Sequence, residues 1–145
     1  MKFLNALQPL GLLILRLALA VVFVYHGYPK LVRADAGMHD FFVQHGFPSY
    51  FVGLAGILEC LGGGLLVIGL FTRPVALLLA IEMGMVIWKV KLAHSVLAVN
   101  DYQLELALGA ACFALATVGA GALSIDHLLF GEGEKRRRSS KSSKE

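Results

Sequence analysis

The sequence predicts an all-α integral membrane protein, a four-helix bundle with a short amphipathic helix between spans 1 and 2. Hydrophobic residues make up 57% of the 145-residue chain and charged residues only 16%, whereas soluble domains carry about 25% charged residues. The apolar residues also gather into four stretches, each near the length of about 20 residues that one spanning helix needs. We therefore expect one four-span membrane domain over residues 1–130, followed by a tail over residues 131–145.

The first two spans flank a polar connector. We predict the first span from Pro9 to Tyr28, ending at Pro29-Lys30, and the second from Tyr50 to Leu70. Within the connector, four side chains recur at helical spacing, which predicts a short amphipathic helix lying at the membrane interface. These side chains are Met38, Phe41, Phe42 and His45.

The third and fourth spans follow a tight turn at Thr72-Arg73-Pro74. Thr72 is a candidate N-cap, and Pro74 suits the first helical turn. We predict the third span from Val75 to about Val90 and the fourth from Tyr102 to Ala122, with Asn100-Asp101 breaking the helical pattern between them. A short terminal segment is expected over residues 125–130.

The tail has no apolar periodicity and is predicted to be disordered. It carries six basic residues among its serines, namely Lys135, Arg136, Arg137, Arg138, Lys141 and Lys144. Without the tail the chain is close to neutral, so nucleic acid is not an expected partner. We expect the tail to bind anionic membrane lipid or a partner protein.

An even number of spans puts both termini on one side of the membrane. Lys2, Arg73 and the tail lie on that side, and together they outnumber the basic residues on the other side. The positive-inside rule therefore places both termini in the cytoplasm, as in a bacterial-type inner membrane. The basic residues on the outer side are Lys30, Arg33, Lys89 and Lys91.

Three ionisable residues lie well inside the apolar stretches: Arg16, Glu59 and Glu82. A charge at membrane depth costs about 2.5–3.5 kcal/mol on insertion scales, so it faces a partner, a cavity or a ligand. At about 1.5 Å per residue, both glutamates fall near the midplane and Arg16 about one turn nearer the cytoplasm. We expect an Arg16–Glu59 ion pair, which either fixes helix register or belongs to a proton path or ligand site. Glu82 then lacks a partner unless it is protonated or reached by Lys89.

A second polar set falls near the outer ends of the spans. His26 stands out because imidazole titrates near neutrality and suits proton transfer or hydrogen bonding to a quinone carbonyl. Trp88 and Tyr102 are typical interfacial anchors, and this reading also fits Lys89. His94 lies in the same region. The complete candidate ligand or proton pocket comprises Arg16, His26, Lys30, Glu59, Glu82, Lys89 and Glu105.

The sequence shows no motif for an intrinsic cofactor. Cys60 and Cys112 lie within apolar stretches without metal-ligand spacing, and they are either small buried hydrophobes or a redox pair across two helices. We find no nucleotide-binding fingerprint and no nucleophile triad, so no metal site is expected and no catalytic residue is assigned.

The combination of motifs resembles the DoxX family of small four-helix membrane proteins over about residues 10–130. The resemblance implies quinone-linked sulfur oxidation or membrane-anchored redox and oxidative-stress assemblies, and it marks Arg16, His26, Lys30, Glu59 and Arg73 as family-typical polar positions. Its motifs here are His26-Gly27-x-x-Lys30, Gly46-x-Pro48, Leu54-Ala55-Gly56-Ile57-Leu58-Glu59-x-x-Gly62-Gly63, Gly69-Leu70-Phe71-Thr72-Arg73 and Leu123-Ser124-Ile125-Asp126.

Two functions remain open from the sequence. The first is a small redox-associated subunit of a membrane complex, quinone- or proton-linked, whose electrons come from a protein partner and whose candidate cofactor is a quinone. The second is a non-catalytic scaffold or accessory subunit of a larger membrane assembly, in which the buried charges only set the register of the helices.

Overall fold

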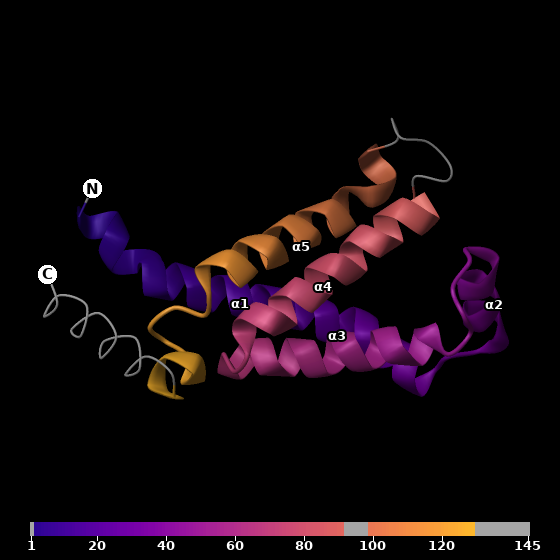
Figure 1. Ribbon diagram of the computed structural model, residues 1–145, viewed down its shortest axis with the longest axis horizontal. Helices are drawn as coiled ribbons and strands as arrows, with labels where there is room; N and C mark the ends of the chain where they lie inside the picture. Colours follow the sequence, from indigo (N-terminus) through magenta and orange to yellow (C-terminus); the bar gives the residue numbers. More distant parts are fainter. Residues whose placement is uncertain (1, 92–98, 130–145) are drawn as a thin grey trace, which may run out of the picture.

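The computed structural model describes residues 2–91 and 99–129, which form helices joined by short turns, with no strand among them (Figure 1). The all-α prediction is confirmed. The tail and His94 lie outside the described residues. The elements are α1 (Lys2–Val32), α2 (Ala36–Gln44), α3 (Phe51–Ile68), α4 (Thr72–Val86), the π-helix η1 (Ile87–Lys91) and α5 (Val99–Val118), with a further helical turn at residues 125–129.

Helix α1 is longer than the sequence predicts, because it continues through Pro29 instead of ending before it. A proline inside a helix removes one backbone hydrogen bond and favours a kink or an end. Here the helical pattern resumes at once, since Arg33 N donates to Pro29 O at 2.8 Å. Lys30 therefore remains on the helix, one turn beyond His26.

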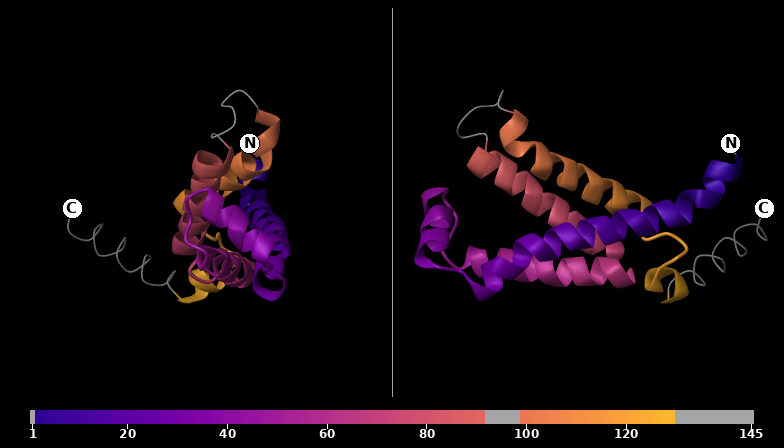
Figure 2. Two further views of the ribbon diagram at one scale, coloured as in Figure 1. Left: turned by 90° about the vertical axis from the view of Figure 1, so that its right-hand side faces the viewer. Right: turned by 180° about the vertical axis from the view of Figure 1, so that it is seen from behind.

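Two helices of the described chain are long and apolar enough to cross a membrane, Ala6–Val32 and Phe51–Ile68. Helix α4 gives way to η1 at Ile87, and the first two turns of α5 carry Asp101 and Glu105. The predicted four-span bundle therefore stays a prediction. The α4–α5 pair lies close to α3 at the α3–α4 turn and diverges from it toward the end that carries α2 (Figures 1 and 2).

Helices α1 and α3 run antiparallel and make the most extensive packing in the structure. Glycines allow their backbones to approach closely, as expected where no hydrophobic force drives two helices together in lipid. A methyl group on Gly27 would lie 2.7 Å from Cβ of Glu59, and one on Gly63 would lie 2.7 Å from Cγ2 of Val24. These contacts fix the register of α1 against α3.

We expect Gly27→Ala to lower the free energy of unfolding by about 1–3 kcal/mol, the usual cost of overpacking, because the new methyl group has no room. Gly53→Ala is the matched control, since nothing lies within 4 Å of a methyl group there. It should be neutral or gain up to about 1 kcal/mol from helix propensity. Unfolding by sodium dodecyl sulfate in mixed micelles, followed by circular dichroism, measures both. Equal effects of the two changes would contradict the close approach of α1 and α3.

Apolar side chains point outward as well as inward. On α3, Leu54, Ile57 and Leu61 are exposed, while Glu59 on the opposite side of the helix is buried. Burial of charge beneath an exposed apolar surface is the reverse of a soluble protein's arrangement and fits a lipid environment. The inward-facing apolar core joins α1, α3, α4 and α5 through Leu19, Ala20, Phe23, Leu66, Val75, Ala76, Leu79, Met83, Cys112 and Leu115.

The α3–α4 turn is closed by a residue from the far end of the chain. Thr72 is not the N-cap that the sequence predicts; it is the first residue of α4, and Phe71 occupies the cap position with a left-handed φ of 50°. The carboxylate of Asp126 accepts hydrogen bonds from the N–H groups of Phe71 and Thr72, each at 2.8 Å. Asp126 N in turn donates to Gly69 O at 2.9 Å. We call this region, residues 69–73 with residues 118–127, the turn end.

Candidate functional site

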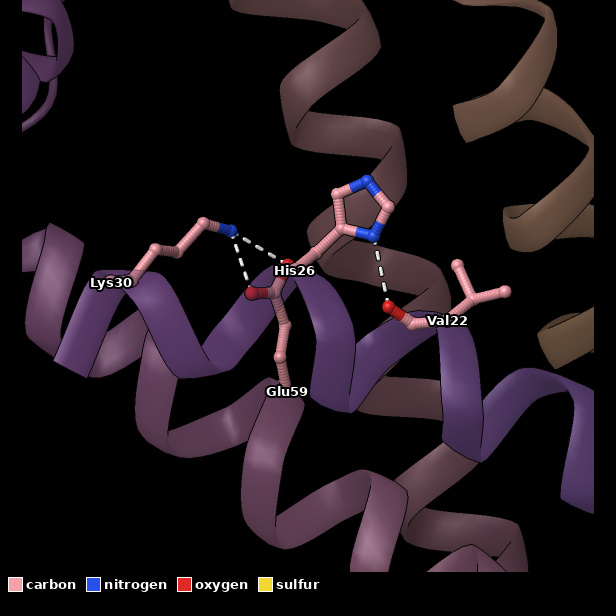
Figure 3. A network of polar contacts seen from close by, with 4 residues as sticks. All are labelled: Val22, His26, Lys30 and Glu59. Carbon is pink, nitrogen blue, oxygen red and sulfur yellow. Dashed lines mark hydrogen bonds and ion pairs between the residues drawn. The ribbon is translucent and has the colours of Figure 1, made fainter. Parts of the chain in front are cut away.

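A buried ion pair joins α1 to α3. Lys30 Nζ donates to both carboxylate oxygens of Glu59, at 2.7 and 2.6 Å (Figure 3). Glu59 is only 2% exposed and Lys30 is 20% exposed. Gly27, three residues before Lys30, lets the two backbones come close enough for this contact. The pair therefore compensates the one full charge that α3 carries.

The predicted Arg16–Glu59 pair is wrong. Gly27 lies directly against Glu59, and Arg16 precedes Gly27 by 11 residues, which is about 16 Å along a helix. This separation is too long for an arginine side chain to bridge. Arg16 lies instead at the turn end, where its Nη2 donates to the backbone oxygen of Leu123.

Glu82 is the second buried carboxylate, on α4 and 5% exposed. Its Oε2 has no hydrogen-bond partner among the described residues. Lys89, which we considered as its partner, donates to Gly46 O at 3.0 Å and lies over the ring of Phe47. Glu82 and Lys30 line one small cavity of about 20 Å³, so Lys30 pairs with Glu59 and also borders the cavity of Glu82. We call Lys30, Glu59 and Glu82 the Lys30 cluster.

A second cavity, of about 100 Å³, lies beside the ion pair. His26, Lys30, Glu59 and Glu105 provide its polar lining, and the remainder is apolar. His26 is exposed, and its Nδ1 is 2.9 Å from Val22 O. Because a carbonyl oxygen only accepts, Nδ1 is the donor, and Nε2 remains available to exchange a proton or to bind a ligand group. His26 thus lies beside the buried pair and is itself exposed in the described structure (Figure 3).

The structure regroups the candidate pocket that the sequence predicts. His26, Lys30, Glu59, Glu82 and Glu105 lie around the two adjoining cavities. Arg16 and Lys89 lie elsewhere, as described above. The sequence groups Lys30 with the outer polar residues because the predicted first span ends before Pro29. In the structure α1 continues through Pro29, and this continuation places Lys30 against Glu59.

The two cysteines do not form a disulfide. Both are free, Cys112 fully buried and Cys60 half-buried. Within residues 2–91 and 99–129, no group of three or more His, Cys, Asp or Glu side chains is arranged to hold a metal ion. The ionisable side chains around the two cavities are a lysine, three carboxyl groups and an imidazole, which can exchange protons and form hydrogen bonds.

Outward-facing apolar helices around a buried ionisable cluster define a small helical membrane protein. The chain belongs to the DoxX family, whose family model matches residues 11–92. It is 32% identical to the inner membrane protein YqjF of Escherichia coli over 85% of this chain and 95% of that protein. It is 31% identical to a Bacillus subtilis protein named "Putative oxidoreductase CatD" over 87% of this chain and 91% of that protein. It is also 30% identical to an uncharacterised Haemophilus influenzae protein over 90% of this chain and 98% of that protein. No solved structure matches the chain significantly.

Proposed function

We propose that this chain is a proton-linked, redox-associated subunit of a membrane complex, and that the Lys30 cluster takes up and releases its proton. In this proposal α1, α3, α4 with η1, and α5 are four membrane spans, with both termini in the cytoplasm. The observation that carries the proposal is the charge count of the cluster. One ammonium and two carboxylates leave a net charge of −1 among buried side chains, and such a charge is expensive at membrane depth.

A single proton on the cluster removes this net charge. The proton has a route, because the 100 Å³ cavity reaches from the ion pair to the exposed imidazole of His26 and to the half-buried Glu105. Lys30 lines this cavity and also the smaller one that holds Glu82. In this proposal a proton enters at His26, reaches Glu59 through the first cavity, and reaches Glu82 through the side of Lys30 that lines both cavities.

The cavity sizes favour a proton over an enclosed quinone. Pockets that bury small molecules usually measure about 300–1,000 Å³, whereas the two cavities here measure about 100 and 20 Å³. A quinone would instead contact His26 from the lipid-facing side. The redox association draws support from the Bacillus subtilis relative named as an oxidoreductase. The electrons would come from a partner protein.

We expect Glu82→Gln to remove a pH-dependent proton uptake by the purified protein in lipid nanodiscs. Two signals report it: the number of protons taken up per chain after a pH jump, and the infrared carbonyl band of a protonated buried carboxyl group. Asp40→Asn is the matched control, because Asp40 is an exposed carboxylate on α2. It should leave the buried carbonyl band unchanged.

Two outcomes decide between the proposal and the scaffold alternative. Loss of the proton signal in Glu82→Gln or Glu59→Gln, with the helical content retained, supports a proton-linked site. A proton signal equal to wild type in both variants contradicts it. Mild detergent extraction followed by mass spectrometry of co-purifying proteins and quinones tests the redox association separately; a partner complex without redox proteins or quinones favours the scaffold.

A further inference from the structure

A cavity of about 510 Å³ opens at the turn end, about five times the volume beside the ion pair and within the size range of ligand sites. Arg73, Ser124, Asp126 and His127 supply its polar side chains, and residues 118–122 also line it. It lies at the start of α4 and the end of α5, where residues 119–127 return beside the α3–α4 turn (Figure 1).

Arg73 is placed to bind a ligand. Its side chain is exposed, and among the described residues it makes one long hydrogen bond, from Nη2 to Val118 O at 3.4 Å. Gly119 has a φ of 91°, and a methyl group there would lie 3.0 Å from Arg73 Nε. The glycine thus leaves room for the guanidinium along the cavity wall. A long contact to a carbonyl is readily exchanged for a shorter, charge-assisted bond to an anion.

Arg16 adds a second guanidinium behind the same wall. It is 1% exposed, and its Nε and Nη1 have no hydrogen-bond partner in the part of the chain that the structure describes. Arg16 and the lining residue Ser124 both lie close to Gly69. A methyl group on Gly69 would be 1.8 Å from Arg16 Nη1 and 2.7 Å from Ser124 Cβ. A buried guanidinium with unused donors is costly unless negative charge lies near it.

The local charge balance is positive. Asp126 is the one carboxylate among the described residues that line the cavity, and both of its oxygens already accept backbone N–H groups. Arg16, Arg73 and Asp126 together carry a net charge of +1, and His127 adds to it when protonated. Two planar guanidiniums near one cavity suit the oxygens of a phosphate group.

We propose that the turn-end cavity binds a phosphate group, held by Arg73 and His127 with Arg16 behind them. The phosphate belongs to the headgroup of an anionic phospholipid or to a free phosphate ion. The lipid is the favoured source, because the cavity lies at one end of helices whose apolar side chains face outward, where headgroups would surround a membrane-embedded chain. This site is separate from the Lys30 cluster, from which the apolar core divides it.

The test uses the full-length protein in a zwitterionic detergent, with phosphatidylglycerol, phosphatidylcholine or inorganic phosphate added. Native mass spectrometry gives the bound fraction, and the shift in melting temperature gives an independent measure. Phosphatidylglycerol should bind and stabilise the wild type. We expect Arg73→Gln to weaken this binding by about tenfold or more, the effect of losing a hydrogen bond to a charged group.

Two matched variants distinguish lipid binding at the cavity from lipid binding by other basic residues. Arg33→Gln removes one exposed guanidinium outside the turn end, so phosphatidylglycerol binding should stay unchanged. A full-length variant with Gln at residues 135–138, 141 and 144 loses the basic tail but should keep the Arg73-dependent binding. His127→Gln should weaken the binding without affecting the fold, which supplies a second probe of the cavity if Arg73→Gln is unstable.

Each outcome decides the proposal. Arg73-dependent binding of phosphatidylglycerol alone identifies a lipid headgroup site, and Arg73-dependent competition by inorganic phosphate identifies a site for free phosphate. The proposal is overturned if Arg73→Gln and Arg33→Gln behave alike. It is also overturned if neutralising the tail abolishes all binding, or if phosphatidylcholine binds as well as phosphatidylglycerol.

Discussion

Replacing Lys30 by methionine is expected to lower the free energy of unfolding by about 3–5 kcal/mol, the usual cost of breaking a buried ion pair. The substitution leaves Glu59, which is 2% exposed, without its two hydrogen bonds and its counter-charge. Unfolding by sodium dodecyl sulfate in mixed micelles measures the loss. Lys89→Met is the control, because the Lys89 ammonium contacts only a carbonyl and a ring among the described residues. It should cost about 1 kcal/mol or less.

The double variant Lys30→Met/Glu59→Met makes this prediction sharper. Replacing both members of a buried pair by apolar side chains of similar size is often neutral or stabilising, so we expect it to recover most of the stability. Glu82 remains in this variant, so the stability measurement isolates the Lys30–Glu59 pair from the proton uptake tested with Glu82→Gln. If the single Lys30→Met costs no more than Lys89→Met, then the pair does not hold α1 against α3.

The second large effect is expected for Gly69→Ala, which should lower the free energy of unfolding by about 3–5 kcal/mol. Gly69 ends α3 with a left-handed φ of 69°, a conformation that costs an L-residue about 1–2 kcal/mol. The added methyl group would also lie 1.8 Å from Arg16 Nη1. It would displace Arg16 from Leu123 O, with the loss of a charged hydrogen bond worth about 1.5–3 kcal/mol.

Gly64→Ala is the control for this change, because it lies within α3 and nothing is within 4 Å of a methyl group there. It should match the wild type or be slightly more stable. The same detergent titration measures both variants. A Gly69→Ala protein as stable as Gly64→Ala would show that Arg16 is not packed against the turn. The infrared carbonyl band of the Lys30 cluster should be unchanged in both variants, since the apolar core separates the cluster from the turn end.

The helices were largely predictable because residues close in sequence determine where each one begins and ends. The predicted second span, Tyr50 to Leu70, agrees closely with α3 (Phe51–Ile68), since Pro48 precedes the apolar run and Gly69 follows it. The predicted helix in the connector is confirmed as α2, and its place at the membrane interface stays a prediction. Its first turn has a cap that local rules explain, because the side chain of Asp35 accepts from Met38 N at 2.9 Å.

The polar contacts were less predictable because they depend on register between helices. Distances from the span ends placed Arg16 about one turn from Glu59, but the contacts of Gly27 and Gly63 set the actual alignment and bring Lys30 to Glu59. Asp126 capping α4 could not be read from local sequence, since 54 residues separate it from Thr72. The burial of Glu59 and Glu82 was foreseen, because charge in an apolar stretch must face inward.

The hydrogen bond from Arg16 to Leu123 has a consequence for the order of events during synthesis. The two residues are 107 positions apart, whereas Lys30 and Glu59 are 29 apart. Both helices of the α1–α3 pair are therefore synthesised early. The backbone oxygen that Arg16 binds is synthesised only after nearly all of residues 1–130. A chain truncated before Leu123 would keep the hairpin and its ion pair, yet hold an arginine without the backbone oxygen it needs. Such a product is one that membrane quality-control proteases would be expected to remove.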